Sequence, residues 1–117
     1  METLTEYFTL SDTACHDQAS LQKLLTLFAD EAIVTDNRGY VYRGREQVDQ
    51  FFKNFFTENI KLKHIFEVYK QDNRVEVNWG VVGQKEKSRK IFALTGTDLA
   101  TLDDRGKIIN LRVTTNH

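Results

Sequence analysis

The chain has 117 residues, of which 40% are hydrophobic and 11% aromatic, and it carries a formal net charge of -1. This length suits one domain with a single core, so we expect residues 1–117 to form one unit. The balanced charge argues against a surface for nucleic acids or acidic membranes. The single cysteine, Cys15, excludes an internal disulfide framework. Since no basic-then-apolar leader and no membrane-length apolar run occurs, we expect a cytoplasmic protein.

The N-terminal third is expected to form two amphipathic helices. Apolar residues between Leu4 and Ser11 recur every three or four positions, which is the period of an α-helix. A second stripe of the same period runs from Leu21 to Phe28, after two candidate N-cap residues, Asp17 and Ser20.

Two short strands and a third helix are expected next. The strands are "AIVTD" and "YVYRG", separated by a turn over residues 37–39. The segment "REQVDQFFKNFF" then has an aromatic stripe at helical spacing. The stripe consists of Val48, Phe51, Phe52, Phe55 and Phe56. We interpret it mainly as core, with its last turns available as the apolar wall of a pocket.

Beyond residue 59 the pattern alternates with a period of two, which predicts four long antiparallel strands. Their sequences are "KLKHIFEVYKQ", "RVEVNWGVV", "FALTGTDLATL" and "KIINLRVTT", and Asp72-Asn73 is expected to form a tight turn between the first two. The predicted class is therefore α+β, with three helices packed on one face of a strongly curved, mostly antiparallel sheet. Such a sheet closed by helices forms a cone with a pocket inside.

One aspartate interrupts the apolar face of a predicted strand. In "FALTGTDLATL", alternation places Asp98 on the same face as Leu94, Ala100 and Leu102. A carboxylate there costs several kcal/mol unless it is paired, hydrogen-bonded or protonated, and such residues cluster at functional sites. We therefore expect Asp98 to line a pocket. The alternatives are that this face is exposed at the sheet edge or that a cation such as Arg112 neutralises the charge.

Two segments resemble the nuclear transport factor 2-like (NTF2-like, cystatin-like) superfamily, which includes ketosteroid isomerase and the SnoaL-like polyketide cyclases. They are "LFADEAIVTDNRGYVYRGREQVDQFF" and "DLATLDDRGKIINLRV". The resemblance implies a cone-shaped α+β fold over nearly the whole chain. In such a cone, the expected pocket-lining residues are Phe52, Phe56, His64, Trp79 and Phe92.

The resemblance to ketosteroid isomerase implies roles for three residues. Asp36 falls at the position of the carboxylate that moves a proton between carbons, and Asp98 at that of a protonated acid that donates a hydrogen bond to the substrate oxyanion. Tyr7 lies near the position of a tyrosine that assists at the oxyanion. This chemistry needs no cofactor. Asp36 can equally be a structural turn residue, because aspartate side chains accept bonds from nearby backbone amides.

The histidines do not predict a metal site. His16, His64 and His117 are scattered and lack the spacing of metal ligands. His64 lies on the apolar face of its strand, where it is either a hydrogen-bonded core residue or part of the cavity wall. We expect no metal.

Two classes of function remain open. In the first, the protein is a cofactor-independent isomerase or lyase in which Asp36 removes a proton from an apolar carbonyl compound and neutral Asp98 stabilises the enolate. In the second, the cone is a non-catalytic module that binds an apolar small molecule or a partner. We also predict a homodimer through the outer sheet face, where we expect Trp79, Val82 and either Ile109 or Leu111.

Overall fold

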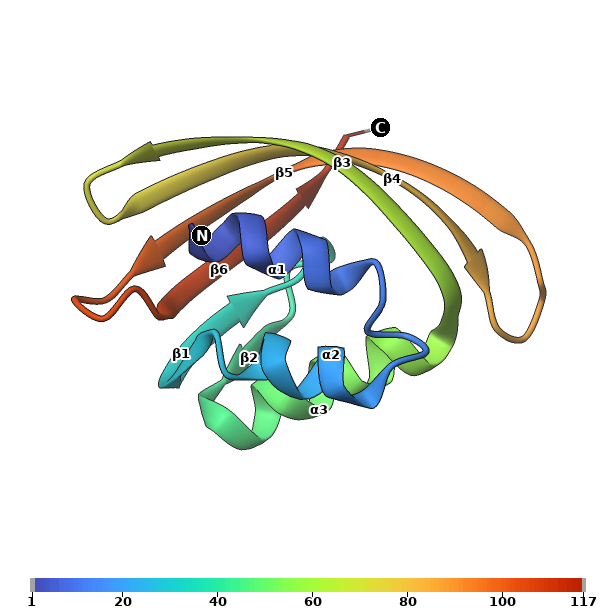
Figure 1. Ribbon diagram of the computed structural model, residues 1–117, viewed down its shortest axis with the longest axis horizontal. Helices are drawn as coiled ribbons and strands as arrows, with labels where there is room; N and C mark the ends of the chain where they lie inside the picture. Colours follow the sequence, from blue (N-terminus) through green and yellow to red (C-terminus); the bar gives the residue numbers. More distant parts are fainter. Residues whose placement is uncertain (1, 117) are drawn as a thin grey trace.

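The computed structural model describes residues 2–116, which form three helices and six strands (Figure 1). His117 lies outside the described residues. In chain order the elements are α1 (Thr3–Ser11), α2 (Gln18–Leu25), β1 (Phe28–Thr35), β2 (Val41–Arg43), α3 (Gly44–Glu58), β3 (Asn59–Gln71), β4 (Arg74–Lys85), β5 (Ile91–Leu102) and β6 (Ile108–Thr115).

The strands form one mixed sheet in the order β2-β1-β6-β5-β4-β3. Strands β1 and β6 pair in parallel and every other pair is antiparallel. Figure 1 shows β3, β4 and β5 as an arch over α1, with α2 and α3 on the same side of the sheet. The predicted α+β class, with three helices against a curved and mostly antiparallel sheet, is confirmed. The prediction of four long strands did not include the parallel pairing of β6 with β1.

Local signals in the sequence set several element boundaries. Of the two candidate caps of α2, Asp17 holds the N-cap position, where its carboxylate accepts a bond from the Ala19 amide at 3.0 Å. The β3–β4 hairpin closes between Gln71 and Arg74, with Asp72 at a φ of +56°. Aspartate tolerates this left-handed conformation better than most residues, so the predicted tight turn forms at Asp72-Asn73.

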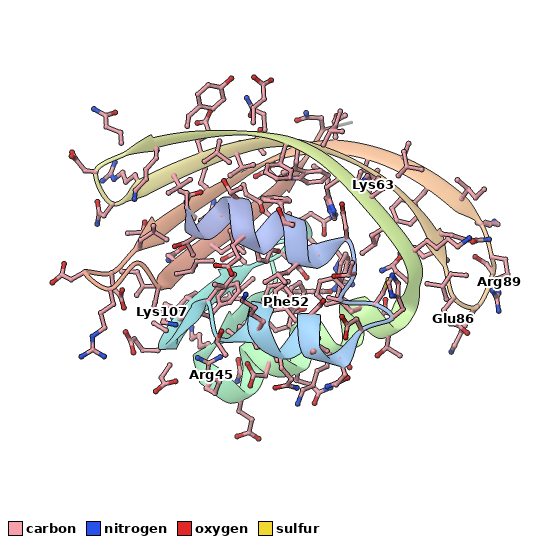
Figure 2. The ribbon with its side chains drawn as sticks, viewed as in Figure 1. Arg45, Phe52, Lys63, Glu86, Arg89 and Lys107 are labelled. Atoms are coloured by element: carbon pink, nitrogen blue, oxygen red, sulfur yellow. The ribbon has the colours of Figure 1, made fainter. Side chains whose placement is uncertain are left out.

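The helices bury their apolar stripes against the concave face of the sheet. On α3, Val48, Phe52 and Phe56 are buried, whereas Phe51 is half-buried and Phe55 is 36% exposed. Phe52 lies in the interior between the helices and the sheet (Figure 2). The aromatic stripe therefore divides into a core edge and an edge that borders open space.

The outer face of the sheet differs from the expected one. Trp79 packs against the core on the concave side, and Leu111 is fully buried there, so neither is available on the convex face. Val82 is 55% exposed, and the convex face adds Ile65 at 76%. The error has a simple cause: Trp79 and Val82 are three residues apart on one strand, so they point to opposite faces.

A glycine makes room for Trp79 on the concave face. Gly96 of β5 pairs directly with Trp79 of β4. A Cβ atom at position 96 would overlap both the Trp79 indole and the carbonyl oxygen of Thr114 on β6. The absence of a side chain thus lets the indole lie across β5.

We predict that Gly96→Ala destabilises the protein by about 1–3 kcal/mol, because the new methyl group must displace both the indole and strand β6. Gly80→Ala is the matched control, since a Cβ at position 80 meets its nearest neighbour, Ile65, at an ordinary 3.5 Å. Urea denaturation of the two variants and the parent measures the difference. Equal stability of Gly96→Ala and Gly80→Ala would contradict this account of the packing.

Candidate functional site

A cavity of about 610 Å³ lies between the concave face of the sheet and helices α1 and α3. Its wall includes Tyr7, Asp36, Phe51, Phe52, Phe55, His64, Trp79, Phe92, Leu94 and Asp98. Phe56 was also expected on the wall but is buried in the core. The centroid of its ring lies 5.0 Å from that of the Phe55 ring. Phe51 and Phe55 supply the apolar wall on α3, since they project from the side of the helix that borders the cavity.

Asp98 is buried at the inner end of the cavity, with 2% of its surface exposed. Its Oδ1 accepts a hydrogen bond of 2.9 Å from the Trp79 indole nitrogen. Among residues 2–116 no cation forms an ion pair with Asp98, and the proposed neutraliser, Arg112, is exposed. Burial raises the pKa of Asp98 to about 7, although the Trp79 bond acts in the opposite direction. The carboxyl group is therefore protonated over much of the acidic range.

Tyr7 reaches the same end of the cavity from α1. Its ring makes edge contacts with Phe28 and Phe52 at centroid distances of 5.9 and 6.0 Å. Burial raises the pKa of the Tyr7 hydroxyl well above its usual value, and the nearby charge of Asp98 raises it further. Among the side-chain hydrogen bonds of residues 2–116, that of Asp98 uses Oδ1, and none involves Asp98 Oδ2 or the Tyr7 hydroxyl. Two polar groups are thus free to bind an oxygen atom of a ligand.

Asp36 also lines the cavity, but its carboxylate is heavily bonded. It accepts bonds from the backbone amides of Arg38 and Tyr40, from the Arg38 guanidinium at 3.1 Å, and from the Tyr42 hydroxyl at 3.1 Å. Burial raises the pKa of Asp36, but the four hydrogen bonds outweigh it and hold the pKa below 3.8. Asp36 therefore has the turn-forming contacts that the sequence allowed and also a place on the cavity wall.

Sequence reasoning did not identify the two side-chain partners of Asp36. Arg38 follows Asp36 by two residues, and a cation within a turn can contact the acid that begins the turn. This spacing was the signal in the sequence that could have identified Arg38. Tyr42 comes from β2, which pairs with β1 directly beside Asp36. Its contact depends on the hairpin, so it has no signature in the local sequence.

The register of the sheet places the two aspartates near each other. Asp98 pairs with Val113 of β6, and the preceding residue, Arg112, pairs with Thr35 of β1. Asp36, the residue after β1, is therefore in the same cross-strand row as Asp98, and the two are separated by two strand spacings. On a flat sheet this separation is about 10 Å, and the curvature of the sheet shortens it for side chains on the concave face.

His64 belongs to the wall formed by β3. Its Nδ1 lies 2.8 Å from Asp12 Oδ1, and its backbone amide donates to the same oxygen, also at 2.8 Å. Burial lowers the pKa of His64 below 6.5, although the Asp12 carboxylate acts in the opposite direction. His64 is therefore hydrogen-bonded to Asp12 and also lies on the cavity wall.

Within residues 2–116, no cluster of three or more histidine, cysteine, aspartate or glutamate side chains is arranged to hold a metal ion. None of the three helices in that range is both long and apolar enough to cross a membrane.

The curved sheet, the helices on its concave side and the order of the elements define the NTF2-like class of α+β fold. The chain belongs to the SnoaL-like domain family, which it matches over residues 7–111. No curated protein matches the sequence.

Solved structures support the same fold. An NTF2-like protein of unknown function from Exiguobacterium sp. 255-15 is 31% identical, with a TM-score of 0.87 over 97% of this chain and 98% of the other. A putative polyketide cyclase from Xanthomonas campestris pv. campestris is 16% identical, with a TM-score of 0.81 over 97% and 87% of the two chains. The epoxide hydrolase/cyclase-like enzyme SalBIII is 20% identical, with a TM-score of 0.81 over 98% and 88%.

We predict that Asp98→Asn gains stability relative to the parent as the pH rises. A folded-state pKa of about 7 lies above the unfolded value of 3.8, so the protonated acid stabilises the fold fully below the unfolded pKa, and this contribution is lost as pH rises through the folded pKa. Asparagine cannot ionise and keeps an oxygen for the Trp79 bond. Between about pH 4 and about pH 8, the difference in unfolding free energy should shift by about 2–4 kcal/mol in favour of the variant.

Denaturant unfolding of both proteins across this range gives the measurement. A variant that loses stability relative to the parent as the pH rises would mean that Asp98 is an ionised, paired residue, contrary to the buried-acid description.

Proposed function

We propose that the cavity binds an apolar carbonyl compound and catalyses proton transfer on it without a cofactor, as an isomerase or lyase. The observation that carries this proposal is a pair of polar groups on the cavity wall, the Asp98 carboxyl, whose Oδ2 is not used by the Trp79 bond, and the Tyr7 hydroxyl. A carbonyl oxygen placed there would receive both donors. An enolate forming on that oxygen would be stabilised more strongly than the ketone, which is the requirement for catalysis.

Trp79 fixes the donor geometry in this proposal. Its indole N–H donates to Asp98 Oδ1, so the proton of the neutral acid resides on Oδ2, the oxygen that Trp79 does not use. Since burial keeps the pKa of Asp98 at about 7, the acid remains a donor at and below that pH.

Asp36 is the proposed proton acceptor for a carbon next to the carbonyl group. It lies on the same wall as Asp98, two strands away, and is ionised because its pKa is below 3.8. To approach a C–H bond, the carboxylate must release one of its four donors. The Arg38 guanidinium is the candidate, because 64% of its side chain is exposed to solvent and can be rehydrated.

The saturated carboxylate of Asp36 also favours the second candidate function, a non-catalytic small-molecule-binding module. If Arg38 and Tyr42 remain bonded to Asp36, no acceptor is free at that end of the cavity. The relatives are consistent with either function. One similar fold is that of a putative polyketide cyclase, and another, ketosteroid isomerase-like, was solved in complex with trimethylamine.

We predict that β-naphthol binds the parent protein and raises its Tm, because its hydroxyl can occupy the oxyanion position while its rings contact the aromatic side chains of the cavity wall. Asp98→Leu should abolish this Tm shift, and Asp98→Asn should retain part of it.

In deuterated buffer the parent should also exchange the protons next to the carbonyl group of isophorone, a cyclic enone, as followed by NMR. Asp36→Asn should reduce this exchange about a hundredfold or more while preserving β-naphthol binding.

The results separate the two candidates. Binding without any exchange above the buffer rate supports the non-catalytic module. Absence of both binding and exchange would overturn the proposal of a ligand cavity altogether.

We further propose a homodimer formed through the convex face of the sheet. Ile65 is 76% exposed and Val82 is 55% exposed on this face, and exposed apolar surface of this kind is uncommon on small monomers.

We predict that light scattering gives a dimer mass for the parent and a monomer mass for the double variant Ile65→Glu with Val82→Glu. Tyr40→Ser, at a 59% exposed tyrosine in the β1–β2 turn, is the control and should remain dimeric. A monomeric parent at micromolar concentration would rule the dimer out.

A further inference from the structure

A histidine–carboxylate pair lies on the cavity wall away from the two aspartates. Asp12, at the C-terminal end of α1, accepts both the backbone amide and the ring Nδ1–H of His64 on a single oxygen. The edge of the Phe8 ring packs against the imidazole at a centroid distance of 5.5 Å, which restricts its rotation. With Nδ1 donating to Asp12, the neutral ring has its lone pair on Nε2. Among the hydrogen bonds of the described residues, those of His64 use its backbone amide and Nδ1, none uses Nε2, and His64 lines the cavity.

The sheet register places Trp79 between Asp98 and the His64–Asp12 pair. His64 pairs with Val81, and Trp79 lies one inward-facing position from Val81 toward the row of Asp98. On a flat sheet, the His64 and Asp98 Cα atoms would be about 16 Å apart, and the concave curvature brings the side chains closer. An apolar molecule lying on the Trp79 indole could thus contact Asp98 at one end and His64 at the other.

We infer that His64, positioned by Asp12, is a second proton acceptor of this cavity and acts on a carbon remote from the carbonyl group. This inference rests on the proposed function, because it uses the oxygen-binding end formed by Asp98 and Tyr7. It also narrows the substrate class. A base far from the oxygen can generate a stabilised anion only when a conjugated chain connects the two, so the substrate is a conjugated enone with hydrogens on its γ-carbon.

The proton transfer balances without any further reactant. Nε2 of His64 takes the γ-proton, so the γ C–H bond breaks and an N–H bond forms. The electron pair moves through the conjugated system to the carbonyl oxygen, where Asp98 and Tyr7 donate hydrogen bonds to the dienolate. Return of a proton from the imidazolium to the γ-carbon regenerates the enone, and in deuterated water this step introduces deuterium.

Asp12 is a positioning residue in this scheme. It holds the ring in the tautomer with Nε2 unprotonated, and its charge stabilises the imidazolium that forms. The remaining charged groups near the ring are Lys63, whose ammonium lies 3.7 Å from the other Asp12 oxygen, and those on the cavity wall, namely Asp36, Arg38, Glu58, Lys85 and Asp98. Burial has the largest effect on the pKa of His64 and lowers it; among the charged groups, Asp12 is in direct contact with the ring and raises the pKa.

The test follows deuterium incorporation into isophorone by NMR, which resolves the γ-carbons from the carbon next to the carbonyl group. We expect His64→Gln to reduce γ-exchange about a hundredfold or more while leaving exchange beside the carbonyl group in place. Asp36→Asn should have the opposite pattern. His16→Gln is the matched control, because His16 is exposed in the α1–α2 connection, and it should equal the parent.

The pH profile tests the role of Asp12. Exchange at the γ-carbons should decline as the pH falls through the His64 pKa, which lies below 6.5. It should also decline as the pH rises through the Asp98 pKa of about 7, because the ionised acid is no longer a donor. Asp12→Asn keeps an oxygen acceptor but removes the charge, so the acidic limb should move to lower pH and the rate should fall. A reduced rate with an unchanged acidic limb would overturn the positioning role.

A second measurement does not require the variants to fold. The ¹⁵N shifts of His64 in the parent should identify a protonated Nδ1 and an unprotonated Nε2 near neutral pH. A proton on Nε2, or full γ-exchange in His64→Gln, overturns the inference while the proposed function stands if exchange beside the carbonyl group and β-naphthol binding persist. If the parent neither binds β-naphthol nor exchanges any proton of isophorone, both the inference on His64 and the proposed function are overturned.

Discussion

The hydrogen bond between the Trp79 indole and Asp98 is the contact on which the site depends. It satisfies one oxygen of a carboxyl group that is 2% exposed and has no cation partner within the described chain. An unpaired buried charge would cost several kcal/mol, so the protein keeps the acid neutral over part of the pH range instead. Gly96 is required for the same contact, because any side chain there would occupy the space of the indole. Three residues on two adjacent strands therefore produce one buried donor.

The cavity has different chemistry along its wall. One part of the wall has the Asp98 carboxyl group and the Tyr7 hydroxyl, and the side near β1 has the Asp36 carboxylate with its four hydrogen bonds. The side near β3 has a histidine bonded to Asp12. Burial raises the pKa of Asp98 and lowers that of His64, so both groups are neutral in a range where an isolated aspartate would be charged. Groups whose environments favour opposite proton-transfer roles within one cavity are what acid–base chemistry on a carbon acid needs.

The family and the fold do not by themselves select a reaction. Folds that enclose a cavity between a sheet and helices accommodate different chemistries through the side chains on their walls. In this chain the wall combines the Phe51 and Phe55 rings of α3 with the polar groups of α1, β3 and β5 and with Asp36, which follows β1. The identity of the substrate therefore depends on the distances among those polar groups, and these distances are set by strand register.

The sequence alone determined the class of fold, the three helices, the hairpin turn at Asp72 and the position of Asp98 on an apolar face. Each of these follows from short-range periodicity or turn chemistry, which neighbouring residues specify. It did not determine the parallel pairing of β1 with β6, which phenylalanines of α3 line the cavity, or the inward orientation of Leu111. The contact of Asp12 with His64 joins residues 52 positions apart, and no local pattern encodes it. Such contacts arise only when the sheet curves over α1, because the curvature brings the end of the helix against β3.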